Sequence, residues 1–542
     1  MPQAQPKPAE YVFSRKQIFW AMTAIFAVYG ALAFSLQTLT IARPKMAADL
    51  NGMSLYAWSV SIPSLVSAFV TLIFGKFSDI YGRRIMLLIS LVSMLIGTVL
   101  AALSPNFIFL IAVSVLIAVG TGAMMPLVFA VVGDMFPPEK RSKWIGLLNI
   151  PMGFFALIGP ALGGWFVDNL SWRYIYWSLL PLLAFCLITV PIGVPSIVSR
   201  GLKRKIDVLG CIYVAIASSA TIVGFSFAGD RYPWGSPQVL GLLGVALIFW
   251  ILFFYAENGA EEPILDPLVL RNRTFFTVVV SSFFSFFGQM AIMMYFPMFL
   301  QGVQEIRSTT SGWIIAPYSV LTAFIGVPVG FLLTRSKRFK WMYLLGYGIL
   351  TAGMFWIVSF GAQTPVWWSV VAACLAGLGL GAIPTVNTMV VQNAVPKRLL
   401  GVAMGATFFV LLMGVAISPA LLGPAMNATY RKTLSDSLPR EFRQIANGST
   451  MASLADPRAL LSETALADLE KFCVAQGDGG RFLFNQTKEA IRTSMEAGLR
   501  MVFWIGAITM LIAFLLINTI PARLQVAEEE IPEPVSHATR VK

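Results

Sequence analysis

Charged side chains divide this chain into long apolar intervals. Twelve long stretches contain no Asp, Glu, Lys or Arg. A helix of roughly 20 apolar residues crosses the hydrocarbon core of a membrane, and a charge within that core is costly. We therefore expect membrane-spanning helices in every interval. The intervals are residues 17–42, 50–75, 85–133, 144–167, 174–199, 208–229, 232–256, 274–304, 308–334, 341–396, 399–430 and 501–522.

The intervals 85–133 and 341–396 are long enough for two spans each. The first contains the polar break Ser104-Pro105-Asn106, and the second contains Gln363-Thr364-Pro365. Each of these intervals is therefore predicted to be a helical hairpin. The whole pattern predicts an all-α polytopic membrane protein with fourteen transmembrane helices.

Composition narrows the function classes. Of the 542 residues, 57% are hydrophobic and 12% are charged, which excludes an ordinary soluble domain. The net charge of +13 does not indicate a nucleic-acid partner, because the polar residues that surround a basic recognition face are missing. The 4 cysteines show no metal-binding spacing, and the 1 histidine, His537, lies near the C-terminus. We expect no cofactor, no metal and no enzymatic activity.

The basic residues predict the orientation. With a cytoplasmic N-terminus, the short cytoplasmic segments and tails hold 24 Lys and Arg residues, and the short outer loops hold 5. Another 10 lie in a long outer loop, and long loops cross the membrane regardless of charge. We expect a multi-pass protein of the plasma (inner) membrane with both termini in the cytoplasm. Anionic membrane lipids are the natural partners of its basic segments.

Two halves of the chain resemble each other. The Gly-rich run from Gly120 to Pro126 resembles the run from Gly377 to Pro384, and a basic loop follows each. Internal repeats of this kind are common in transporters. The predicted segments are a cytoplasmic tail (1–17), a six-helix bundle (18–199), an inserted helix pair with cytoplasmic linkers (200–273), a second six-helix bundle (274–522) with an outer loop (427–497), and a cytoplasmic tail (523–542). Helical spacing over 457–470 predicts a small helical cap in that outer loop.

A polar motif follows the second predicted helix, in the run from Gly75 to Arg84. Gly75 lets two helices approach, Asp79 can cap a neighbouring helix or pair with arginine, and Gly82 permits a sharp turn before Arg83. This run resembles the loop signature of the major facilitator superfamily.

The same motif suggests a gate on the cytoplasmic face. We expect Asp79, Arg83 and Arg141 to hold the outward-open state closed on that face, by ion pairs and by a helix N-terminus near Gly401. Asp134, at the inner end of the fourth predicted helix, is interpreted as a salt-bridge partner in this gate.

The fifth predicted helix carries spaced glycines and a Gly-Pro pair, which suit an interface that opens and closes. Its pattern resembles the antiporter motif of the superfamily, and an aromatic turn at Trp172-Arg173 follows it. The motif residues are Gly153, Gly159, Pro160, Gly163 and Gly164.

Fourteen spans, an inserted pair, these motifs and a long outer loop together resemble the fourteen-helix drug:proton antiporter branch. The resemblance implies export of hydrophobic or amphipathic compounds, with each six-helix half rocking about a central cavity. We expect the protein to act as a monomer.

Two positions depart from that branch. Counting back from Pro44 to the usual acidic position lands on Ser35, and counting back from Pro126 to the usual arginine lands on Ser114. No Asp, Glu, Lys, Arg or His lies in the middle of any predicted span. A proton carrier must titrate, so protons are the family partner that this sequence supports least.

Polar amides and adaptable apolar side chains are the candidates to line the substrate cavity. Without an embedded negative charge, the cavity is expected to take small neutral, zwitterionic or lipid-like compounds rather than cations. The candidates are Gln37, Asn149, Phe287, Gln289, Met290, Met293, Tyr295 and Asn387.

Two other functions remain open from the sequence. One is a lipid or glycolipid flippase that works without a proton gradient. The other is a membrane sensor or scaffold that does not transport.

Overall fold

The computed structural model describes residues 14–51, 55–196, 207–229, 232–259, 263–335, 339–446, 454, 463–475 and 479–521. Within them, 14 helices are long and apolar enough to cross a membrane, as the charge pattern predicts. The two double intervals form hairpins. In the first, the side chain of Asn106 accepts a hydrogen bond from the Phe109 amide at 2.8 Å and so begins the second helix of the hairpin.

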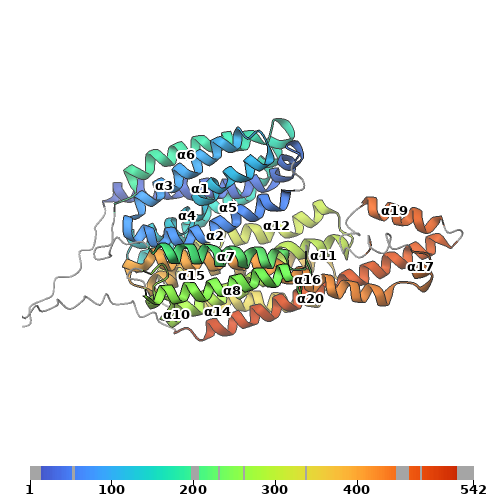
Figure 1. Cartoon of the computed structure of the whole chain (residues 1–542). Helices are drawn as coiled ribbons and strands as arrows, with labels where there is room; N and C mark the ends of the chain where they lie inside the picture. Colours follow the sequence, from blue (N-terminus) through green and yellow to red (C-terminus); the bar gives the residue numbers. More distant parts are fainter. Residues whose placement is uncertain are drawn as a thin grey trace, which may run out of the picture.

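The first six spans pack into one group (Figure 1). In it α1 packs against α5 and α6, α2 against α4, and α3 against α4 and α6. Their bounds are α1 Arg15–Asp49, α2 Tyr56–Tyr81, α3 Arg83–Ala102, α4 Phe107–Met135, α5 Pro138–Asn169 and α6 Arg173–Gly193.

The inserted pair consists of α7 (Val208–Phe227) and α8 (Pro237–Gly259), which pack side by side. Helix α7 also contacts α2 of the first group and α16 of the last group. A short helix, α9 (Pro267–Arg271), leads from the pair to the last six spans.

Two of the last six spans are built from several helical pieces. The first runs through α10 (Arg273–Met290), a π-helical turn η2 (Ala291–Tyr295) and α11 (Phe296–Gly302). Pro297 is the second residue of α11, and its missing N–H accounts for the irregular turn before it. The second runs through α12 (Ser308–Phe324) and α13 (Gly326–Arg335).

The other four spans of this group are continuous helices. Helix α20 packs against α10, α14 and α16, while α15 packs against α12 and α14. Their bounds are α14 Lys340–Val358, α15 Val366–Ala394, α16 Leu400–Ser437 and α20 Gly480–Asn518, and a 3-10 turn η3 (Lys397–Leu399) precedes α16.

The predicted outer loop consists largely of helix. Helices α16 and α20 continue beyond the bundle, where α17 (Arg440–Ile445) and α19 (Glu463–Val474) lie beside them (Figure 1). The described part of the predicted helix over 457–470 begins at Glu463, and residues 455–462 lie outside the described residues. Lys488 of α20 pairs with Glu305 at 2.8 Å, which ties this cap to the turn between α11 and α12.

We call this end of the molecule the cap side. The opposite end, where α1 begins at Arg15 and α20 ends at Asn518, is the termini side.

Candidate functional site

A buried ionic cluster lies at the termini side, where α2 ends and α3 begins. Gly82 turns the chain with a φ of 93°, a conformation that glycine adopts without strain. This turn brings Arg83 to within 2.5 Å of Asp79, and Arg83 also donates to Asp134 of α4 at 2.8 Å. Asp79 is 1% exposed and Arg83 3% exposed. Arg84, the next residue, is half-buried.

The carboxylate of Asp79 also reaches the other half of the molecule. It accepts hydrogen bonds from the backbone N–H groups of Gly401 at 3.0 Å and Val402 at 2.9 Å, in the first turn of α16. Asp79, Arg83 and Asp134 together carry one net negative charge, and the N-terminus of a helix carries a partial positive charge of about half a unit. The first turn of α16 therefore compensates part of the charge of the cluster.

Glycines allow α2 and α16 to approach at this contact. A Cβ atom on Gly401 would lie 2.7 Å from Oδ1 of Asp79, and a Cβ on Gly75 would lie 3.0 Å from the Cα of Gly405. Side chains at these positions would push the two helices apart. The hydrogen bonds to Asp79 therefore depend on the absence of side chains at Gly75 and Gly401.

Arg141, at the start of α5, makes a second contact between the halves. Its Nε donates to the carbonyl of Phe136 at 2.8 Å, and its Nη1 lies 3.1 Å from the carbonyl of Gln392 and 3.2 Å from Oδ1 of Asn393, both in α15. The side chain of Gln392 in turn donates to the carbonyl of Phe129 in α4 at 2.8 Å.

Helices α5 and α13 also pack closely on the termini side of the bundle. A Cβ on Gly146 would lie 3.2 Å from the Cα of Gly330. One turn further along α5, Asn149 donates to the hydroxyl of Thr385 in α15 at 3.2 Å. Polar and glycine contacts thus join the two halves both at α2–α16 and at α5–α13.

The glycines of the fifth helix meet different neighbours. Gly153 packs against Ala323 of α12, so it faces the second half. Gly159 and Gly163 pack against α1, where a Cβ on Gly159 would lie 2.7 Å from the Cβ of Gln37. Nothing lies within 4 Å of a Cβ on Gly164. Pro160 belongs to α5, but its side chain lies outside the described residues.

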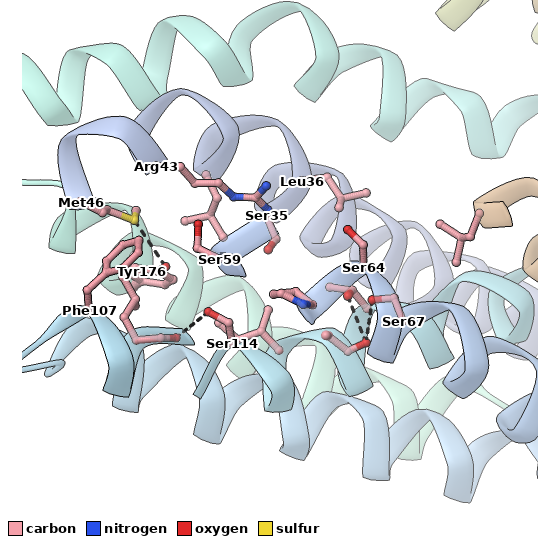
Figure 2. Close-up of a pocket in the computed structure, with 17 residues that line it drawn as sticks. Ser35, Leu36, Arg43, Met46, Ser59, Ser64, Ser67, Phe107, Ser114 and Tyr176 are labelled. Atoms are coloured by element: carbon pink, nitrogen blue, oxygen red, sulfur yellow. Dashed lines mark hydrogen bonds between the residues drawn. The ribbon is translucent and has the colours of Figure 1, made fainter. Parts of the chain in front are cut away.

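A cavity of about 160 Å³ lies toward the cap side, among α1, α2, α4 and α6. Figure 2 shows Met46, Phe107 and Tyr176 at one end of it, and Ser64 and Ser67 at the other. Leu412 of α16 is the lining residue that comes from the second half. The lining residues are Ser35, Leu36, Leu39, Arg43, Met46, Ser59, Pro63, Ser64, Ser67, Phe107, Leu110, Ser114, Ile117, Ala118, Thr121, Tyr176 and Leu412.

Comparison with known proteins identifies the family. The family model described as Major Facilitator Superfamily matches residues 25–419. The chain belongs to the major facilitator superfamily. It is therefore a multi-pass membrane transporter of small molecules and not an enzyme, which confirms the family and the fold predicted from the sequence.

Relatives of the chain within the superfamily include named drug transporters. The multidrug transporter protein MdtP of Bacillus subtilis (strain 168) is 28% identical over 474 residues, which cover 86% of each chain. Multidrug resistance protein 3 of the same strain is 27% identical over 418 residues, covering 77% of this chain and 81% of its own. The structure of the proton:xylose symporter XylE bound to 6-bromo-6-deoxy-D-glucose has a TM-score of 0.58 at 12% identity, covering 95% of this chain and 99% of its own, which shows the shared fold.

Both neutral positions at which the chain departs from the fourteen-helix branch of the superfamily line the cavity. Ser35 on α1 and Ser114 on α4 belong to its wall. The hydroxyl of Ser114 donates to the Leu110 carbonyl one turn earlier, at 2.7 Å. The expected sites of an acid and an arginine thus meet at one cavity, where this chain has two hydroxyl groups.

None of the predicted cavity residues is among the residues that line this particular cavity. Gln37 lies against Gly159, Asn149 lies in the contact between α5 and α15, and Asn387 donates to Ser282 at 2.8 Å inside the second half. Along α10 and η2, Phe287 and Tyr295 are buried, Gln289 and Met290 are half-buried, and Met293 is 63% exposed.

Sequence reasoning missed one residue at the cavity, one at the contact between the halves, and one buried acid at the end of α8. Arg43 lies directly after the first charge-free interval and lines the cavity from α1. Gln392, 1% exposed, bridges the halves, and no charge marks it in the sequence. Glu257 ends an apolar run in α8, where it is 4% exposed and accepts the N–H groups of Ile264 at 3.1 Å and Leu265 at 3.0 Å. The position of Glu257 directly after the apolar run was the available signal.

Proposed function

We propose that the protein is a secondary active exporter of hydrophobic or amphipathic small molecules that works by rocker-switch alternating access. One observation carries the mechanism: a carboxylate of the first half, Asp79, caps the first turn of α16 in the second half. A rocking motion that opens the termini side must break this contact. The gate is therefore a set of hydrogen bonds between the two six-helix halves. Contacts that can form and break between two rigid halves are what a two-state transporter requires.

The contacts describe one of the two states. Asp79, Arg141 and Asn149 all join the halves toward the termini side, while the cavity lies toward the cap side. The proposal places the protein in the plasma membrane with both termini in the cytoplasm. In this state the cytoplasmic side is then closed, and substrate enters or leaves the cavity from the outer side. We propose that the protein works in this way as a monomer.

The cavity supports the substrate class. Apolar side chains and hydroxyl groups form most of its wall, and the seventeen residues that line it include no Asp or Glu. Drug-type ligands bind to walls of this kind, with a few polar groups that fix their orientation. The names of the multidrug relatives agree with this substrate class, whereas cationic drugs find no countercharge among the lining residues.

The same wall argues against proton coupling through the cavity. Asp79 and Asp134 are held by Arg83 at the termini side, and Glu257 holds a backbone turn at the end of α8. No lining residue titrates as an acid near neutral pH. We therefore expect transport that is indifferent to a proton gradient.

Flux into proteoliposomes tests this function. The purified protein is reconstituted with a panel of amphipathic dyes or with NBD-labelled phosphatidylcholine, each with and without a pH gradient. We expect dye flux above that of protein-free liposomes, equal in both conditions. Absence of flux for every dye would refute the transport function, and clear acceleration by the gradient would refute transport that is independent of protons. Movement of the lipid alone would favour a flippase.

A further inference from the structure

One formal charge lies in the wall of the cavity. Arg43 is located near the cap-side end of α1, and Figure 2 shows its side chain pointing toward Ser35, one of the lining residues. Side chains on a helix tilt toward its N-terminus, so the guanidinium is directed into the bundle rather than away from it. Arg43 is the only Lys, Arg, Asp or Glu among the described lining residues.

A second hydrogen-bond donor faces the same end of the cavity. Tyr176 of α6 is 4% exposed, and its hydroxyl contacts the sulfur of Met46 at 3.8 Å. A thioether is a weak acceptor, so this hydroxyl retains most of its capacity to donate to an oxygen atom. Arg43 and Tyr176 both line this one cavity. Arginine and tyrosine therefore present donors, and no anion, to an occupant.

The remaining wall is suited to an apolar group. Leu36, Leu39 and Ile117 face the cavity from the first half, and Leu412 faces it from the second. An apolar cavity of about 150 Å³ holds a benzene-sized molecule, and this cavity measures about 160 Å³. It therefore accepts a headgroup and the adjoining carbons of a substrate, with the rest of the molecule extending beyond it.

From these observations we propose that the cavity binds the anionic end of an amphipathic substrate, a carboxylate or sulfonate, through the guanidinium of Arg43 and the hydroxyl of Tyr176. A planar guanidinium matches the two oxygens of such a group. The proposal narrows the substrate class given under the proposed function. The role of the anion site in transport rests on that function, whereas binding of the anion to the cavity does not depend on it.

Leu412 links such an occupant to the gate. Helix α16 supplies Leu412 to the cavity, and its first turn binds Asp79 at the termini side. A substrate in the cavity therefore touches the helix that the gate holds. The apolar part of a bound substrate can therefore shift α16 through Leu412 and so change the contact between Asp79 and the first turn of α16.

Binding of matched probes to the purified protein in neutral detergent tests the proposal. The probes are 11-(dansylamino)undecanoic acid and its methyl ester, which differ in one negative charge. The wild type should bind the acid about tenfold or more tightly than the ester, because a charge-assisted hydrogen bond is worth about a factor of ten or more. Arg43→Gln should weaken binding of the acid far more than binding of the ester and so remove this preference, while Arg43→Lys should restore part of it.

Lys45→Gln is the matched control. Lys45 lies two residues further along α1, is exposed, and pairs with Asp49 at 3.1 Å, so its loss changes the net charge equally without touching the cavity. This variant should keep the full preference for the acid. An unfolding midpoint in detergent equal to that of the wild type shows that a variant is folded.

Several results would overturn the proposal. Equal wild-type affinity for acid and ester, absence of binding for both, or an equal loss for both probes in Arg43→Gln would each do so. Displacement of the bound acid by dihexanoyl phosphatidylglycerol, but not by dihexanoyl phosphatidylcholine, would identify a lipid headgroup as the natural anion. If neither lipid displaces the acid, the natural anion is a free acid. Acid binding in the wild type without flux of any probe would refute transport and leave the anion site intact.

Discussion

At the scale of single residues, the account depends on how a few buried charges are compensated. Asp79 receives one arginine and two backbone N–H groups, and these partners come from both halves of the molecule. A buried charge that loses its partner costs several kcal/mol. Opening the termini side therefore has a definite electrostatic cost, which substrate binding and the alternative contacts of the other state must offset.

Replacing Asp79 with Asn should slow transport by about tenfold or more. The amide keeps the shape but loses the charge, and hydrogen bonds to charged groups contribute about 1.5–3 kcal/mol, so the ratio of closed to open molecules falls about tenfold or more. Initial dye flux in proteoliposomes measures the effect, at equal amounts of inserted protein. Asp468→Asn is the control. It makes the same chemical change on the exposed face of α19, away from the contact between the two halves, and should leave flux unchanged. Unchanged flux in Asp79→Asn would rule out a gating role for this carboxylate.

The sequence predicted this cluster only in part. Asp79 and Arg83 lie four residues apart across a glycine turn, so their pairing follows from local geometry. Gln392 and Asn393 meet Arg141 across more than 250 positions of the chain, and nothing in their neighbourhood distinguishes them from other amides. The first charge-free interval ends just before Arg43, because such intervals end at a charge, whereas α1 continues past Arg43 to Asp49.

At the scale of the helix, small residues set how closely α5 approaches its neighbours. Gly163 faces the backbone of α1 at Thr38, and Gly164, the next residue, faces open space. Both glycines belong to the run that resembles the antiporter motif, and the motif alone does not separate them. The difference arises from the 100° turn per residue that places adjacent side chains on different faces.

These two glycines give a matched pair of variants. A Cβ at Gly163 would lie 2.7 Å from the Thr38 carbonyl, so Gly163→Ala should destabilise the protein by about 1–3 kcal/mol through overpacking. Gly164→Ala meets nothing within 4 Å and should be neutral or stabilising by up to about 1 kcal/mol, because alanine favours helix. Unfolding midpoints in detergent and dye flux check both. Equal effects at the two positions would contradict the assigned packing of α5.

Helix continuity was also beyond the reach of the charge pattern. The interval 274–304 was assigned one span, and the structure divides it among α10, η2 and α11. The length and the apolar character were correct because they follow from the thickness of a membrane. The π-helical turn follows from a local loss of hydrogen bonding at Pro297, which a count of charges does not detect.

At the scale of the whole molecule, the number of spans was predictable and the conformational state was not. Every interval without charge contains one span or one hairpin of two spans, because a charged side chain in the membrane interior is costly. In the proposed rocker switch, the state depends on which contacts between the halves are closed, and one sequence encodes both states. The structure shows Asp79 and Arg141 in contact with the second half at the termini side, and the proposal assigns these contacts to the inward-closed state.

A distance measured across the termini side tests the central claim most directly. Spin labels placed at exposed Lys140 of the first half and exposed Lys397 of the second, in a background without the native cysteines, report the separation of the halves by double electron–electron resonance. We predict one short distance in the resting wild type, a second and longer distance during substrate turnover, and a shift toward the longer distance in Asp79→Asn. A single distance that changes neither with substrate nor with Asp79→Asn would contradict alternating access gated by this contact.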